Sequence, residues 1–103
     1  MSVIEIIKRN FDNEVMFSDR PLLLEFFATD SDDCKAMADV ICEVADENLG
    51  IKVCTIDVAT EPEIAARFEV TSTPTFIAFK TGKVRARRTG IVEKSDILEM
   101  LKA

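Results

Sequence analysis

The stretch LLLEFFATDSDDCK, residues 22–35, contains the pattern on which the fold prediction depends. Residues 22–28 form a near-continuous apolar run of strand length, interrupted only by Glu25, which is typical of a central strand covered on both faces. The polar residues 30–33 then predict a loop and the entry to a helix, because serine and aspartate are preferred at helix starts. A buried strand that runs directly into a helix indicates an α/β protein.

Patterns on either side of this stretch predict the remaining elements. Hydrophobic periodicity and turn residues place them as follows. Strands are expected at 3–7, 51–58, 75–79 and 84–89, and helices at 10–17, 34–48, 62–68 and 95–101. Asn10 is expected to cap the first helix, and Gly50 to end the second, whose apolar stripe is Met37, Ala38, Ile41, Ala45 and Leu49. Thr81-Gly82 is expected to close a hairpin.

The resulting order, β-α-β-α-β-α-β-β-α, predicts a central mixed β-sheet flanked by helices on both faces. The chain has 103 residues, which suits one core. No linker, repeat or low-complexity segment divides it. We therefore expect residues 1–103 to form a single domain.

Composition excludes several classes of function. The net charge is -6, which disfavours binding to phosphate backbones, and there is no histidine for catalysis or metal ligation. No apolar run approaches the roughly 20 residues that span a bilayer, and no signal peptide is evident. The odd number of cysteines, Cys34, Cys42 and Cys54, favours free thiols in a reducing compartment. We expect a cytoplasmic protein, without nucleic-acid or membrane partners and monomeric.

Several local motifs resemble those of the thioredoxin family over nearly the whole chain. Residues 25–28 are similar to the family's Asp-Phe-Trp-Ala, and Cys34-Lys35 to the end of its Trp-Cys-Gly-Pro-Cys-Lys. Residues 73–75 are similar to its Ile-Pro-Thr, residues 79–83 to its Phe-Lys-x-Gly-x hairpin, and Thr89-Gly90 to its Val-Gly. The resemblance implies the thioredoxin fold and a cis peptide bond at Thr73-Pro74.

The resemblance also locates a catalytic site, with Ser31 at the position of the attacking cysteine and Cys34 at that of the resolving one. A serine hydroxyl has far too high a pKa to attack a disulfide, and it cannot form a disulfide with Cys34. The two-thiol cycle is therefore not expected to run in this chain alone. Cys34 is best interpreted as a small buried residue, with a regulatory or monothiol role as the alternative.

The acids Asp30, Asp32 and Asp33 around this position allow three interpretations. Capping and compensation of the helix dipole explain most of them. A cation site is the second, although the glycine and distant glutamate of a calcium loop are missing, so no metal is expected. In the third, the family's apolar docking surface has become acidic, so that partners of ordinary thioredoxins are rejected.

Glu25 falls at the family's buried acid, which moves protons for the resolving cysteine. Burial in an apolar strand is expected to raise its pKa. The family often places a lysine nearby, and the matching position here is Thr55. Two explanations stay open: Glu25 is a relic, or it pairs elsewhere.

Thr73 and Pro74 resemble the loop that pairs with an extended substrate segment, a role that does not need the missing cysteine. The same proline also has a structural use in fixing the turn. In the basic stretch 83–88, Lys83, Arg85 and Arg87 are expected to share one face of a strand. This stretch is best interpreted as a charged edge strand that resists aggregation, with an anionic partner as the alternative.

Two functions follow. The first is a thioredoxin-like protein of thiol–disulfide redox homeostasis, related to protein-disulfide reductases, with weak or absent dithiol activity and no cofactor. The second is a non-enzymatic module that binds a protein or peptide with an extended segment through the cis-proline groove. The Ser-x-x-Cys site also resembles that of the chaperedoxins, which carry a helical-repeat region that these 103 residues lack. The sequence leaves open whether the chain is an enzyme.

Overall fold

The computed structural model describes residues 3–103, so the first two residues of the predicted domain lie outside the described part. The strands are β1 (Val3–Glu5), β2 (Leu22–Phe27), β3 (Lys52–Asp57), β4 (Thr75–Lys80) and β5 (Lys83–Thr89). The helices are α1 (Asp32–Glu47), α2 (Pro62–Arg67), α3 (Lys94–Lys102) and a one-turn π-helix, η1 (Asp12–Met16). This order confirms the predicted succession of elements.

One mixed sheet joins the five strands in the order β1-β3-β2-β4-β5. Strands β1 and β2 run parallel to β3, whereas β4 is antiparallel to β2, and β5 is antiparallel to β4. Strand β2 is central and is buried from Leu22 to Phe26, as its apolar run predicts.

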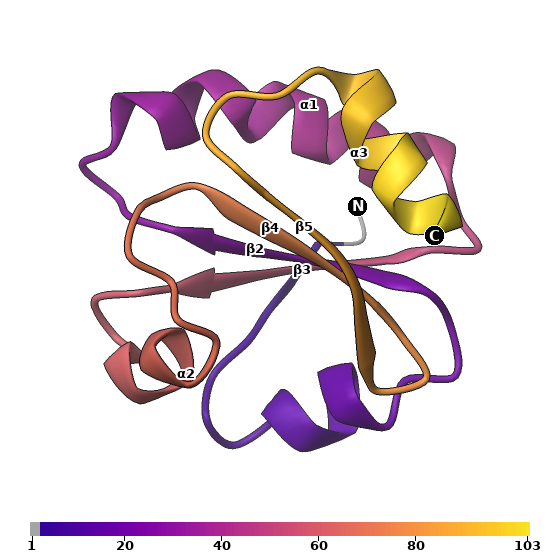
Figure 1. Cartoon of the computed structure of the whole chain (residues 1–103), viewed down its shortest axis with the longest axis horizontal. Helices are drawn as coiled ribbons and strands as arrows, with labels where there is room; N and C mark the ends of the chain where they lie inside the picture. Colours follow the sequence, from indigo (N-terminus) through magenta and orange to yellow (C-terminus); the bar gives the residue numbers. More distant parts are fainter. Residues whose placement is uncertain (1–2) are drawn as a thin grey trace.

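Helices cover both faces of the sheet, which confirms the predicted α/β class (Figure 1). Helices α1 and α3 lie on one face, where Leu23, Val53 and Phe76 pack beneath them. The π-helix η1 and α2 lie on the other face, over a core that includes Phe26 and Phe79. No helix within residues 3–103 is long and apolar enough to cross a membrane.

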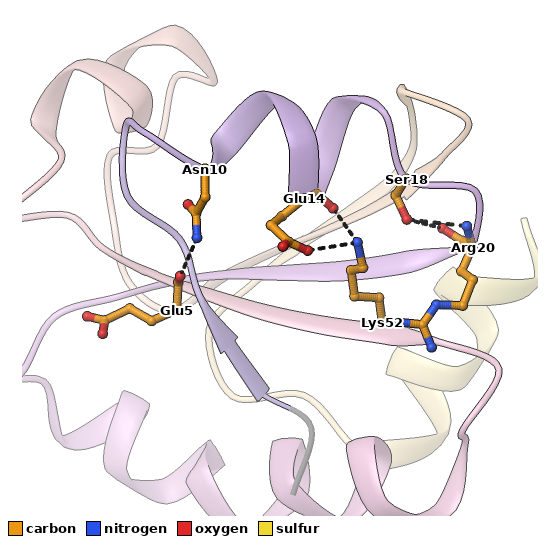
Figure 2. A network of polar contacts seen from close by, with 6 residues as sticks. All are labelled: Glu5, Asn10, Glu14, Ser18, Arg20 and Lys52. Carbon is orange, nitrogen blue, oxygen red and sulfur yellow. Dashed lines mark hydrogen bonds and ion pairs between the residues drawn. The ribbon is translucent and has the colours of Figure 1, made fainter.

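The first helical segment differs from its prediction. The regular helix expected over 10–17 is a π-turn in which the Phe17 N–H donates to the Asp12 carbonyl, and Asn10 does not cap it. The Asn10 side chain instead accepts the Ile7 N–H at 2.8 Å. It also donates to the Glu5 carbonyl at 3.0 Å (Figure 2). Asn10 therefore stabilises the turn after β1, because its side-chain amide bonds to the backbone of that turn and not to the first N–H groups of η1.

An ion pair attaches η1 to the sheet. The Lys52 ammonium reaches the Glu14 carboxylate at 3.0 Å and the Glu14 backbone carbonyl at 2.9 Å (Figure 2). Lys52 is the first residue of β3, so this contact joins η1 to the sheet across 38 residues of sequence.

Helix α1 begins two residues before the predicted Cys34 and buries a somewhat different stripe. Its buried residues are Cys34, Met37, Ile41, Val44 and Ala45. The predicted stripe was wrong at Ala38, which is exposed, and at Leu49, which is 75% exposed because the helix ends at Glu47. Gly50 was also wrongly assigned as the stop, because it lacks the positive φ of such a glycine.

The β4–β5 hairpin contains the predicted turn at Thr81-Gly82, with φ of 50° and 77°. A β-bulge beside Ala78 and Phe79 changes the register of β5. Lys83 pairs with Lys80 but Arg87 pairs with Ile77, an odd number of residues away, so the two basic side chains lie on opposite faces.

The prediction that Lys83, Arg85 and Arg87 share one face was therefore wrong. The Arg87 guanidinium donates to the carbonyls of Phe68 and, at 2.8 Å, Glu69, just after the end of α2. Strand β5 does lie at the sheet edge, as expected. Arg87 thus anchors α2 beneath the edge strand, and only the rest of the basic stretch remains as a charged edge.

Candidate functional site

Sheet register brings the predicted site residues to one end of the molecule. Phe26 of β2 pairs with Thr75 of the antiparallel β4, so the chain leaving β2 and the chain entering β4 meet at the same end of the sheet. The first of these chains carries Ser31 and Cys34, and the second carries Thr73 and Pro74. Residues 39 to 43 positions apart in the sequence thus come to one end of the molecule.

Ser31 is the N-cap of α1. Its Oγ accepts the backbone N–H of Cys34 at 3.2 Å, and its own backbone is extended, as capping requires. Asp32 and Asp33 occupy the exposed first turn, where their charges are favourable to the helix dipole, and Asp30 is exposed just before. Among residues 3–103, no three acidic or cysteine side chains are placed to hold a metal ion.

Cys34 is buried, with 7% of its surface exposed. It faces the space between α1 and the sheet, where it lines a cavity with Glu25 and Ala38. No second sulfur occupies the Ser31 position, so Cys34 has no neighbour at the helix start with which to form a disulfide. The geometry offers one shielded thiol and one capping hydroxyl.

Glu25 is buried on the α1 side of β2, at 5% exposure. Burial raises its pKa from 4.5 to about 7, as the sequence predicts in direction. Thr55 lies next to it in register on β3. No ion pair found within residues 3–103 includes Glu25. The second explanation, that Glu25 pairs with another residue, therefore finds no charged partner in this part of the chain.

The Thr73-Pro74 peptide bond is cis, which confirms the prediction. Pro74 is buried, and its carbonyl accepts the Gly90 N–H at 2.8 Å. The Thr75 hydroxyl donates to the Ser72 carbonyl at 2.8 Å and so stabilises the loop before β4. Thr73 itself is only half-buried.

The other cysteines are also free. Cys54 is fully buried on the η1 side of the sheet, and burial raises the pKa of its thiol to about 12. Cys42 is half-buried on α1, eight residues after Cys34.

Sequence reasoning missed the cavity of about 330 Å³ between α1 and the sheet. Ala38 and Cys42 line it from the helix, and Thr55 and Val3 line it from the sheet. The available signal was the small Ala38 in a stripe of larger apolar residues, combined with the strand pairing of Thr55 and Glu25.

A central mixed sheet, a capped helix start that carries one cysteine, and a cis proline on the adjoining loop define an α/β protein of the thioredoxin fold. Comparison with known proteins agrees with this class. The family model described as Thioredoxin matches residues 2–103. The chain therefore belongs to the thioredoxin family.

Similar curated proteins include a thioredoxin of Mycobacterium tuberculosis, 37% identical over 101 residues that cover 97% of this chain and 87% of the relative. A thioredoxin of Pseudomonas aeruginosa is 29% identical over 102 residues, covering 98% and 94%. The bifunctional thioredoxin reductase/thioredoxin of Mycobacterium leprae is 37% identical over 99 residues, which cover 95% of this chain and 22% of that protein. These relatives support a thiol–disulfide redox protein in general terms.

Proposed function

We propose that this chain is a thioredoxin-like protein of thiol–disulfide redox homeostasis whose own dithiol exchange is weak or absent. The observation that carries the proposal is Ser31 at the N-cap of α1, where its hydroxyl oxygen accepts the Cys34 N–H. Disulfide exchange needs a thiolate to attack and a second sulfur to release the product. Cys34 is the one cysteine of this site, and only 7% of its surface is exposed. The site therefore has neither an accessible nucleophile nor a second thiol with which Cys34 could form a disulfide.

The charge around Ser31 supports the same conclusion. Asp30, Asp32 and Asp33 are exposed at the start of α1. Their negative charges disfavour a further anion such as a thiolate. They thereby offset the stabilisation that the helix dipole would give to a thiolate at the start of α1. They also present an acidic surface to partners. We therefore expect this chain to bind different partner proteins from thioredoxins whose docking surface is apolar.

Reduction of insulin by dithiothreitol tests this proposal. The chain should not accelerate the reaction beyond the rate of the reductant alone, whereas a thioredoxin with two active-site cysteines should. A Cys34→Ser variant is the matched control and should behave like the unchanged chain. A rate near that of the two-cysteine thioredoxin, lost in Cys34→Ser, would overturn the proposal.

A second candidate is a binding module for extended peptide segments. The observation that favours it is the backbone of Thr73, which makes no backbone hydrogen bond with any other described residue, although Pro74 and Gly90 beside it are paired. A free N–H and carbonyl on a half-buried loop can pair with an extended strand. The acids at the start of α1 favour a segment that carries basic residues.

Titration of the ¹⁵N-labelled chain with a short, unstructured basic peptide tests this candidate. The Thr73 amide signal should move together with those of the first turn of α1. An acidic peptide of equal length is the control and should bind more weakly. Shifts that spare Thr73 would contradict the binding role.

The three unpaired thiols also favour a reducing compartment such as the cytoplasm, with the chain acting as a monomer. Fractionation and light scattering test these two expectations. Recovery in an oxidising compartment, or a stable dimer, would contradict them.

A further inference from the structure

The cavity under α1 has the size and lining of a small-molecule site. Its volume is about 330 Å³, near the lower end of the range for ligand pockets. Apolar walls come from Phe27 and Ala28 at the end of β2 and from Ala38 and Ile41 of α1. A ligand of roughly ten heavy atoms would find apolar contact there.

Small residues on both walls leave this space open. On α1, Cys34, Ala38 and Cys42 are spaced four residues apart, so they share one face of the helix. On the sheet, Thr55 lies opposite them beside Glu25. None of these side chains is long enough to fill the gap between the helix and the sheet edge.

Glu25 is the one acid in the cavity lining. The titratable groups that share the cavity are the Cys34 and Cys42 thiols and the ammonium of the exposed Lys35, all from α1. β3 contributes Thr55 and β1 contributes Val3, while the Glu5 carboxylate of β1 is exposed outside the lining. Phe76 flanks Glu25 on β4.

None of these neighbours compensates the charge of Glu25. No ion pair within the described chain includes its carboxylate, and burial is the one cause of its raised pKa, with no contribution from Lys35. An ionised carboxylate in an apolar pocket is costly unless a cation pairs with it. The cavity therefore combines an apolar body with a single acid that has no partner when it ionises.

We propose that this cavity binds a compact apolar organic cation, with its ammonium group against the Glu25 carboxylate and its apolar body between Ala38 and Phe27. The ammonium donates hydrogen bonds to the carboxylate, and the hydroxyl of Thr55, which lines the cavity beside Glu25, can accept another. An anion would be repelled, and a neutral molecule would leave the carboxylate unpaired. This assignment is independent of the missing cysteine and of peptide binding.

A matched pair of probes tests the proposal: 2-phenylethylamine, which is a cation at neutral pH, and its neutral isostere 2-phenylethanol. Binding is measured by NMR titration of the ¹⁵N-labelled chain. Because Glu25 ionises with a pKa of about 7, the affinity for the amine should rise about tenfold between pH 6 and pH 8. The affinity for the alcohol should fall over the same range, and the moving signals should come from α1 and β2.

Three variants separate the cavity from general attraction to an acidic protein. Glu25→Gln should remove the pH dependence and the preference for the amine. Ala38→Leu should fill the cavity and weaken both probes. Glu99→Gln, which removes an exposed acid of α3, should leave binding unchanged.

Equal affinity for the two probes at pH 8 would overturn the proposal. So would full amine binding by Glu25→Gln, or shifts confined to residues outside the cavity. Loss of amine binding in Glu99→Gln to the same extent as in Glu25→Gln would also overturn it, because it would show attraction to net charge alone.

Discussion

Ser31 holds the first turn of α1 through one side-chain oxygen, at 3.2 Å from the Cys34 nitrogen. The same position determines the chemistry of the site, because a sulfur there would face the only thiol of the helix start. Loss of the cap alone, as in Ser31→Ala, should cost about 1 kcal/mol of stability. Chemistry and capping at this residue are therefore separable by substitution.

The substitution Ser31→Cys should let the new thiol form a disulfide with Cys34, since the Ser31 side chain already lies at the start of α1, 3.2 Å from the Cys34 backbone nitrogen. Activity in insulin reduction should nevertheless remain well below that of a thioredoxin with two native cysteines. The negative charges of the neighbouring aspartates should disfavour the new thiolate, and a rise of one pKa unit would lower the thiolate fraction about tenfold at neutral pH.

Asparagine at positions 30, 32 and 33 in the same background should recover part of the lost activity. Mass spectrometry checks the disulfide, and the insulin assay checks the rate. Absence of a disulfide would refute the assignment of Ser31 and Cys34 as the site. Full activity without neutralisation would refute the electrostatic argument.

Glu25 should make the stability of the whole chain depend on pH. Its pKa is raised from 4.5 to about 7 in the folded state, so folding favours the protonated form. Its contribution is fully present below pH 4.5 and is lost as pH rises through 7, by about 3 kcal/mol in all.

Urea unfolding between pH 5 and pH 8 measures this dependence. The free energy of unfolding should fall with pH in the unchanged chain and be flatter in Glu25→Gln, which cannot ionise. Parallel pH profiles for the two proteins would contradict the prediction.

The β4–β5 hairpin depends on one glycine. Gly82 has a φ of +77°, and a Cβ built there would lie 2.7 Å from the Met16 carbonyl oxygen. Alanine at this position must therefore adopt a left-handed backbone and displace η1. The hairpin and η1 are thus coupled through a single backbone approach.

Gly82→Ala should lower the free energy of unfolding by at least about 1 kcal/mol. Gly50→Ala is a matched control, because its backbone is not left-handed and no atom lies within 4 Å of the added Cβ. That variant should be neutral or slightly stabilising. Chemical denaturation of both variants checks the contrast, and equal losses would contradict it.

The sheet separates the thiols of the molecule. Cys34 and Cys42 lie on the α1 side, whereas Cys54 belongs to the core under η1 and α2. Along α1 the two helical cysteines are eight residues apart, a rise of about 12 Å, which exceeds the reach of a disulfide. No pair of the three can therefore be bridged without unfolding.

Mild oxidation should leave the monomer with three thiols. In the folded chain, Cys42 should react first with a thiol reagent and Cys54 last, because burial raises the Cys54 pKa to about 12. Thiol counting before and after oxidation, with and without denaturant, checks both statements. Loss of two thiols from a monomer would contradict the first.

The sequence by itself determined which segments became strands and helices. The apolar run of β2, the helical spacing of α1 and the Thr81-Gly82 turn each depend on contacts within a few residues, so a local pattern specifies them. It also identified the buried Glu25 and, through the family resemblance, the cis Thr73-Pro74 bond.

Only the tertiary structure decided what depends on distant partners. The bulge in β5 directs Arg87 toward the end of α2, and the Asn10 side chain bonds to the turn after β1. The gap opposite Thr55 leaves Ala38 exposed beside a cavity. Each outcome depends on strand register and on how closely a helix approaches the sheet. The energies that determine strand register and helix position come from packing between segments tens of residues apart. Hydrophobic periodicity and secondary-structure propensity do not encode this packing, because they reflect only neighbouring residues.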